Sequence, residues 1–172
     1  MSGWKKNCRR SARTFSELRE TDPAMASLLA ADREDLDTIA ALTQDSLLRA
    51  CDTHYDAKRR TLTLLLNRFR WEEQEPRRGY CLLRLLGVEK AQRRSWPENR
   101  AAVLDLLHID ADDDLVELVF AGGTAIRCRV EAIDLLLEDV GAPWEVDGRP
   151  DHEDDPDPPE TDDGEADDTP TA

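Results

Sequence analysis

The stretch TLTLLLNRFRW, residues 61–71, shows the alternation of side chains that is typical of a half-buried β-strand. Leu62, Leu64 and Leu66 recur at every second position, so they project from one face of the strand. Arg68 and Arg70 continue the same face. The opposite face carries threonines and a leucine followed by Asn67, Phe69 and Trp71. The stretch therefore predicts an apolar strand that ends in polar, cationic and aromatic groups.

Strand-like segments lie on both sides of this stretch. We expect about six strands, in residues 46–50, 61–71, 80–88, 103–109, 115–120 and 124–129. His54 and Tyr55 are candidates for a further short hairpin strand. The last two strands predict a hairpin around Gly122 and Gly123, because glycine accepts the positive φ angles of a tight turn. The inward face of this hairpin is expected to comprise Val116, Leu118, Phe120, Ile126 and Cys128.

Two segments have helical spacing instead. Asp32 and Asp35 indicate a helix start, and apolar residues then recur every three or four positions through residues 33–43. The second segment follows residue 130, and its apolar residues at helical spacing are Ile133, Leu136, Leu137 and Val140. Gly141 and Pro143 predict its end. We therefore expect a short N-terminal helix and an amphipathic C-terminal helix.

Together these elements predict an α+β fold. We expect a single domain with an about six-stranded, mostly antiparallel curled sheet and the two helices. Either the helices cover the apolar face of the sheet, or the sheet curls around the C-terminal helix as a partly open barrel. The second arrangement is similar to the pleckstrin-homology-like superfold in its strand count and terminal helix. Such a likeness carries no function.

The composition divides the 172 residues into three parts. Residues 1–24 have six basic and three acidic side chains and no apolar periodicity, so we expect a disordered basic extension, and Met25 offers an alternative translation start. Residues 25–148 hold the periodic segments and form the expected folded domain. Residues 149–172 contain eleven acidic residues and no large apolar residue, which predicts a disordered acidic tail. The tail either keeps the protein soluble or contacts a basic surface.

The sequence also indicates where in the cell the protein is located. No apolar run approaches the about 18 residues that a membrane helix needs, and no signal-peptide pattern follows the basic N-terminus. We therefore expect a cytoplasmic protein that does not contact membranes. The four cysteines form no CxxC pair and are interpreted as small apolar residues rather than disulfides or metal ligands: Cys8, Cys51, Cys81 and Cys128.

Motifs for catalysis are missing from the sequence. It contains no nucleophile elbow, phosphate loop or dinucleotide fingerprint, so we expect neither catalytic residues nor a cofactor. His108 lies in an apolar strand and is interpreted as a half-buried structural residue, and His54 as an exposed turn residue. A run of acidic residues is interpreted as a solvated turn rather than a metal site, although divalent cations prefer such oxygen ligands: Asp110, Asp112, Asp113 and Asp114.

Charge placement is the most informative feature for function. Residues 58–100 contain twelve basic and five acidic residues in a chain whose net charge is −15. The arginines of this region either pair with the acidic parts of the same domain or form a surface for a partner. We interpret the polar and aromatic end of the 61–71 strand as a binding surface, formed by Asn67, Arg68, Arg70 and Trp71.

Three functions remain open on this basis. The leading hypothesis is a noncatalytic binding or accessory module that engages another protein. A second hypothesis is a small enzyme that uses Arg68 and Arg70 to bind an anionic substrate and His54 to move a proton. A nucleic-acid-binding module is the third, and the overall negative charge opposes it. Composition and spacing leave the oligomeric state open.

Two long segments resemble a known family. They are LLAADREDLDTIAALTQDSLLRACDTHYDAKRRTLTLLLNRFRWE, residues 28–72, and VELVFAGGTAIRCRVEAIDLLLEDVGAPW, residues 116–144. The resemblance depends on residues 33–36, the Gln44 and Asp45 pair, LNRFRWE, and FAGG with the following IRCRVE. It is to the uncharacterised bacterial domain-of-unknown-function family 2948. This resemblance implies a bacterial cytoplasmic protein and supplies no activity, cofactor or catalytic residue.

Overall fold

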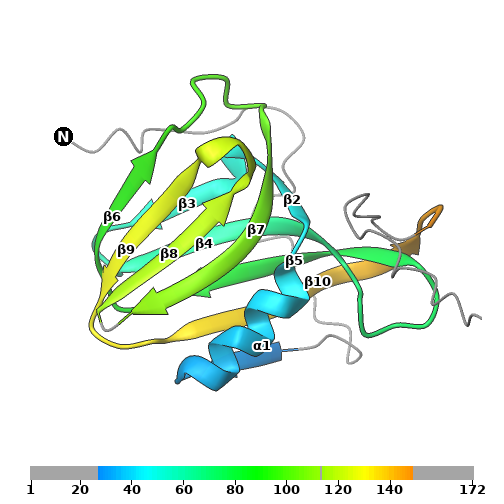
Figure 1. Cartoon of the computed structure of the whole chain (residues 1–172), viewed down its shortest axis with the longest axis horizontal. Helices are drawn as coiled ribbons and strands as arrows, with labels where there is room; N and C mark the ends of the chain where they lie inside the picture. The colour runs from blue at the N-terminus through cyan, green and yellow to red at the C-terminus, as the bar shows by residue number, and fades with distance from the viewer. Residues whose placement is uncertain (1–26, 113, 149–172) are drawn as a thin grey trace, which may run out of the picture.

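The strand predicted from residues 61–71 is present as β4 (Thr61–Phe69) and lies inside a ten-stranded antiparallel sheet (Figure 1). The computed structural model describes residues 27–112 and 114–148. In chain order its remaining elements are β1 (Ser27–Ala30), α1 (Arg33–Thr43), β2 (Ser46–Arg49), η2 (Ala50–Asp52), β3 (Thr53–Asp56), β5 (Arg77–Leu85), β6 (Val88–Arg94), β7 (Val103–Asp112), β8 (Leu115–Phe120), η3 (Ala121–Gly123), β9 (Ala125–Val130) and β10 (Leu135–Glu145).

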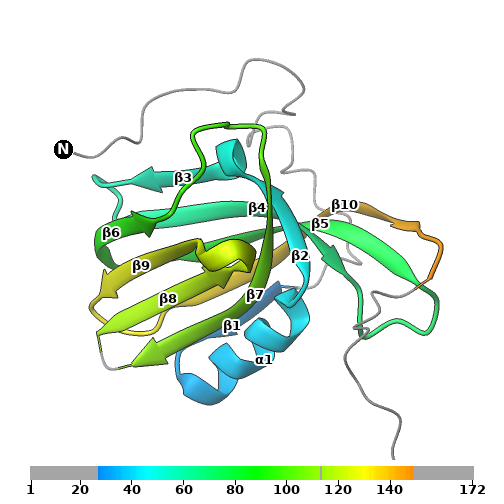
Figure 2. The same ribbon diagram turned by 45° about the horizontal axis from the view of Figure 1, so that its top comes forward.

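The sheet curls until its far strand returns to the centre. Neighbouring strands follow the order β1-β10-β5-β4-β2-β7-β8-β9-β6, and β3 also pairs with β4. β6 is the last strand of this order, but its Val88 amide donates to the Arg60 carbonyl at 2.8 Å, beside the start of β4. The Tyr55 hydroxyl on β3 donates to the Val88 carbonyl at 3.2 Å. The strands therefore wrap around a common interior (Figure 2).

Alternating apolar residues fill that interior. The alternation in β4 places Leu62, Leu64 and Leu66 inside, each at most 1% exposed. The inward face predicted for the β8–β9 hairpin is confirmed, because all five of its residues are buried. Helix α1 packs against β1, β7 and β4 and contributes Leu36 and Ile39 to the same core. The core thus joins the helix to both halves of the curled sheet.

The N-terminal helix begins and ends where the sequence predicts. The Asp32 carboxylate accepts a hydrogen bond from the Asp35 amide at 2.9 Å, which satisfies one of the free amides of the first turn. The hairpin turn between β8 and β9 also uses its glycines as expected. Gly122 and Gly123 have φ angles of 73° and 75°, in the region that favours glycine.

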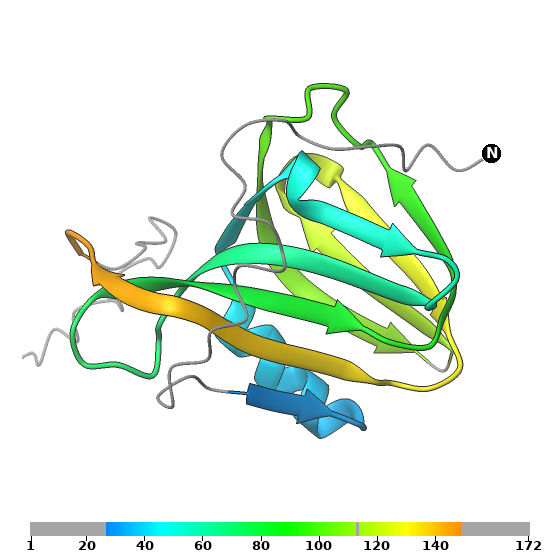
Figure 3. The same ribbon diagram turned by 180° about the vertical axis from the view of Figure 1, so that it is seen from behind.

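The predicted fold class is wrong in two respects: the sheet has ten strands rather than about six, and no C-terminal helix is present in the described residues. The segment expected to form that helix is β10, which pairs with β1 on one side and β5 on the other (Figure 3). Leucines at 135, 136 and 137 satisfy both periods, and Gly141 with Pro143 lies in a register shift within the strand rather than at a helix end. The expected likeness to the pleckstrin-homology-like superfold depended on the strand count and the terminal helix, so it is wrong as well.

One residue-level expectation also needs correction. His108 is exposed rather than half-buried, because the pairing of β7 with β8 shifts register between Leu106 and His108. This bulge places both Leu107 and His108 at the surface. The basic extension at residues 1–24 and the acidic tail at 149–172 lie outside the described residues. Within the described part of the chain, no helix is long and apolar enough to cross a membrane.

Candidate functional site

Arg68 lies in the molecular interior, where it forms a paired charge cluster with Asp139. The residue is 1% exposed, and Asp139 on β10 is 3% exposed. The guanidinium donates to both oxygens of the Asp139 carboxylate, from Nε at 2.9 Å and from one terminal nitrogen at 3.0 Å. Such two-point pairing is the strongest geometry available to arginine and carboxylate. Arg68 therefore does not form part of the surface.

Glu72 completes the hydrogen bonding of the Arg68 guanidinium. Its two oxygens accept from the two terminal nitrogens of Arg68 at 2.7 and 3.0 Å. Burial alone would lower the pKa of Arg68, but the hydrogen bonds that Arg68 donates to Glu72 and Asp139, together with the charges of the two carboxylates, outweigh it and raise that pKa. Partial burial alone would raise the pKa of Glu72, but the hydrogen bond donated by Arg68, a backbone hydrogen bond and the charges of Arg68 and Arg70 together outweigh it and lower that pKa. Both groups are therefore held in their charged forms.

Arg70 extends the cluster toward the end of β4. One of its terminal nitrogens lies 3.3 Å from Asp139 Oδ2, and its Nε forms an ion pair with Glu73. Gly79 on β5 lies between the two partner strands, and a Cβ there would lie 3.8 Å from Arg70 Cδ. Arg68 on β4 and Arg70, one residue beyond its end, are thus joined to one carboxylate of β10 across the intervening strand.

The opposite face of the same strands carries aromatic residues at the surface. Asn67 on β4 lies opposite Tyr80 on β5, and Tyr80 is 47% exposed. The Tyr80 ring packs on Trp144 of β10 with ring centroids 5.1 Å apart. Arg78 lies opposite both Phe69 and Trp144, and Phe69 packs on Trp71 at 4.6 Å. We call this outer face the arm surface: Asn67, Trp71, Arg78, Tyr80 and Trp144. It covers the ends of β5 and β10 that extend beyond the curled sheet (Figure 3).

Two polar atoms of the arm surface have no hydrogen-bond partner among the described residues. Asn67 Oδ1 and Trp71 Nε1 are both buried without one. Buried polar groups are almost always hydrogen-bonded in folded proteins, and each unmade bond costs about 1–3 kcal/mol. The backbone carbonyl of Asn67, in contrast, accepts from Arg78 at 3.2 Å. The arm surface therefore contains one buried hydrogen-bond acceptor and one buried donor that are not satisfied by the described residues.

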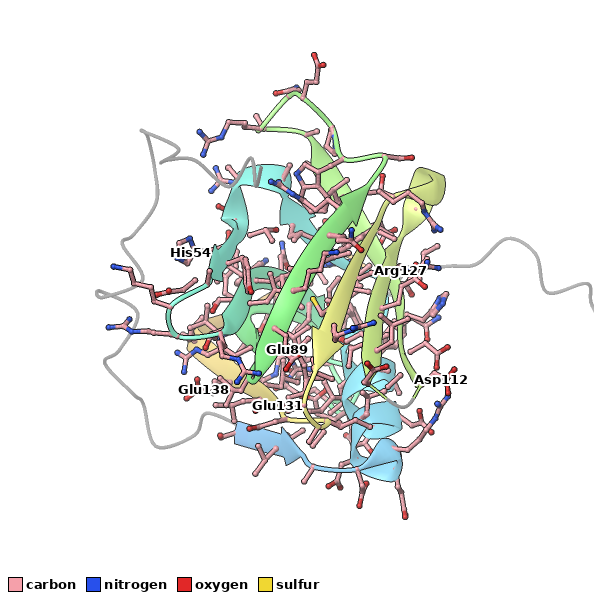
Figure 4. The ribbon with its side chains drawn as sticks, turned by 90° about the vertical axis from the view of Figure 1, so that its left-hand side faces the viewer. His54, Glu89, Asp112, Arg127, Glu131 and Glu138 are labelled. Carbon is pink, nitrogen blue, oxygen red and sulfur yellow. The ribbon has the colours of Figure 1, made fainter. Side chains whose placement is uncertain are left out.

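The structure does not bring together the three residues of the enzyme hypothesis. His54 lies opposite Thr63, which is on the outer face of β4, and its side chain is exposed (Figure 4). Arg68 lies five positions further along β4 on the inner face. An open hollow lined by Glu75, Pro76, Glu145 and Val146 adjoins the arm and contains neither His54 nor the arginines. His54 therefore cannot act on a substrate held by Arg68.

The described residues also supply no grouped metal ligands. No three His, Cys, Asp or Glu side chains in residues 27–112 and 114–148 are placed to hold one ion. Two members of the acidic run are used in ion pairs: Asp110 with Arg33 at 2.8 Å and Asp114 with Arg129 at 3.3 Å. These two ion pairs indicate a structural role for Asp110 and Asp114.

Asp139, Tyr80 and Trp144 were not predicted from the sequence as residues of this site. Asp139 was assigned to a helix, so its pairing with Arg68 across the sheet could not be predicted. Its sequence signal was its position, because Asp139 continues the alternation of Leu135 and Leu137 just as Arg68 continues that of the leucines of β4. The aromatic pair depends on the pairing of β5 with β10, for which the sequence carries no local signal.

Comparison with known proteins agrees with the resemblance noted from the sequence. No curated protein and no solved structure matches the chain. The family described as "Protein of unknown function (DUF2948)" matches residues 26–152, which include every described strand and the helix. Because that match covers most of the sequence, the chain belongs to the DUF2948 family, whose function is unknown.

Proposed function

We propose that the chain is a noncatalytic cytoplasmic binding module that engages another protein through the arm surface. Asn67 and Trp71, predicted from the sequence as binding residues, belong to this surface. Arg68 and Arg70 act behind it as positioning residues, because they join the ends of β4 and β10. The binding roles of Asn67 and Trp71 and the positioning roles of Arg68 and Arg70 remain predictions.

The observation that supports this proposal is the contact between Tyr80, which is exposed, and Trp144, which is partly exposed, beside Arg78. Tyrosine, tryptophan and arginine are the residues that most often dominate the binding energy of protein interfaces. The rings of tyrosine and tryptophan bury a large area at a small cost in conformational entropy.

The charges around the arm favour a protein over a nucleic acid. Arg77 is paired with Glu75 at 2.7 Å and lies within 4.0 Å of Glu73 and Glu145. Arg68 and Arg70 are paired internally with Asp139. A phosphate backbone needs unpaired exposed cations, and the chain as a whole carries a net charge of −15. The pairing of Arg68, Arg70 and Arg77 with carboxylates therefore favours a protein partner over a nucleic acid.

Quantitative affinity purification of the tagged full chain from its native cells tests the proposal. Tyr80→Ala and Trp144→Ala should each reduce a specific co-purifying protein by about 30-fold, since an interface hot spot contributes about 2 kcal/mol. Arg84→Ala is the matched control. Arg84 is on the same outer face of β5, in a partly exposed ion pair with Glu138 at 2.7 Å, and its loss should change capture little.

Thermal unfolding of each variant accompanies the purification, so that a loss of fold is not mistaken for a loss of binding. Equal capture by the wild type and both aromatic variants would contradict the proposal. Capture that disappears on nuclease treatment would favour the nucleic-acid hypothesis instead.

A further inference from the structure

The outer face of β6 and β9, remote from the arm, carries four exposed cations. Figure 4 looks onto this side of the molecule, with Arg127 labelled. We call these residues the basic strip: Lys90 and Arg94 on β6, and Arg127 and Arg129 on β9. The three arginine side chains are 52–62% exposed.

Strand register places these cations side by side. Lys90 lies opposite Arg129, and Gln92 lies opposite Arg127. Ile126 and Cys128 alternate with the arginines of β9 and are fully buried, which fixes Arg127 and Arg129 on the outer face. Two antiparallel strands therefore present a row of positive charge that the core packing keeps outward.

Carboxylates of the described residues neutralise only half of this charge. Glu117 on β8 is shared between Arg127 at 3.0 Å and Arg94 at 3.7 Å, and Asp114 pairs with Arg129 at 3.3 Å. No described acidic side chain lies within 4.0 Å of the Lys90 ammonium. Two carboxylates beside four cations leave an excess of two positive charges. These like charges lie on neighbouring strands and repel one another.

We propose that the basic strip binds the chain's own acidic segment, residues 149–172. This segment carries eleven acidic residues and one arginine, whereas the strip is positive in a chain that is otherwise strongly acidic. A nucleic acid is the poorer occupant, because the net charge of −15 repels it. The attached segment is held at a high effective concentration, of the order of millimolar for a flexible linker.

The length of the segment permits this contact. β10 ends on the side of the molecule away from β6 (Figures 1 and 3), so the segment must cross the domain. Its 24 residues span up to about 80 Å when extended. A folded unit of about 120 residues has a radius of gyration of about 14 Å. The segment can therefore reach the strip around either side.

Zero-length carbodiimide cross-linking of the full chain tests the proposal, because this reagent joins a lysine amine to a carboxylate in contact with it. Lys90 is one of only four lysines, and residues 149–172 contain none, so the products are unambiguous by peptide mass spectrometry. We expect cross-links from Lys90 to carboxylates of residues 149–172 at low salt. About 0.5 M NaCl should remove them, since it screens exposed charges beyond a few ångströms.

Charge reversal then identifies the strip as the site. Arg127→Glu with Arg129→Glu should reduce the Lys90 cross-links at least fivefold, and Arg33→Glu with Arg100→Glu is the control of equal charge change elsewhere on the surface. Thermal unfolding checks each variant. If the reversal unfolds the chain, Arg127→Gln with Arg129→Gln replaces it with the same readout.

Three results would overturn the proposal. They are an absence of such cross-links at low salt, an equal loss in the control pair, and cross-links that join differently isotope-labelled chains, which would assign the strip to a second copy.

Discussion

At the scale of single residues, the molecule depends on Arg68 and Asp139, which are 71 positions apart in the chain and paired in its interior. Removing one partner of a buried ion pair costs about 3–5 kcal/mol, and here it leaves Arg68 with Glu72 as its remaining partner. We predict this loss in the free energy of unfolding for Asp139→Ala, measured by chemical denaturation.

The paired substitution provides the control for this loss. Arg68→Met with Asp139→Leu replaces both charged side chains with apolar side chains of similar volume. The free energy of unfolding of this double variant should therefore lie within about 1 kcal/mol of the wild-type value or above it. A double variant as unstable as Asp139→Ala would contradict this interpretation.

Glu72 makes the cluster sensitive to acid. Its pKa in the folded state is below the ordinary value of 4.5, because Arg68 donates to it. The stabilisation is therefore complete above about pH 4.5 and is lost as the pH falls through the lowered pKa. We predict that Glu72→Gln is less stable than the wild type at pH 7 and that the difference shrinks by about pH 3, as measured by urea unfolding. A difference that is constant with pH would contradict this role.

At the scale of elements, β10 provides the sharpest contrast between sequence and structure. A helix over residues 133–140 would place Leu136 and Leu137 on one buried face, whereas the strand buries Leu137 and leaves Leu136 partly exposed. We predict that Leu137→Ala costs about 2–5 kcal/mol and Leu136→Ala clearly less, measured by denaturant unfolding. Similar costs at both positions would be expected from the helix and would contradict the strand.

The elements that could be predicted are those whose signals are local. The cap at Asp32, the alternation in β4 and the glycine pair of the β8–β9 turn each fix a structure within a few residues. β1 and β6 were missed because edge strands bury little: β6 has Val88 as its one fully buried residue. β10 was misassigned because three consecutive leucines fit both periods, and only its neighbours β1 and β5 decide between them.

The candidate site was predicted in part, for the same physical reason. The end of β4 was identified from its chemistry, but burial depends on what packs against each face. An arginine in line with three core leucines can be explained as structural only once the opposing carboxylate has been placed. The residues that complete the arm surface come from β5 and β10, and their register is a property of the whole sheet.

At the scale of the whole molecule, the cysteines report on the integrity of the curled sheet. Burial raises the pKa of Cys128 to about 12 and also raises the pKa of Cys81, so neither thiol ionises in the native state near neutral pH. Cys51 is only partly buried. Among the three cysteines of the described residues, we predict that an alkylating reagent at about pH 8 modifies Cys51 first, followed by Cys81 and Cys128 at one common slow rate set by global unfolding. Mass spectrometry of each cysteine peptide measures these rates, and rapid modification of Cys81 would show that β5 opens locally.

The central claim concerns the whole arm: the proposed contact is made by Tyr80 and the partly exposed Trp144, and Arg68 and Arg70 hold the strands behind them. The most direct test compares the partner captured by two folded variants of the full chain. Arg68→Met with Asp139→Leu should retain the partner within about threefold of the wild type, whereas Tyr80→Ala should lose about 30-fold. Loss of the partner from the first variant together with its retention by Tyr80→Ala would contradict the account.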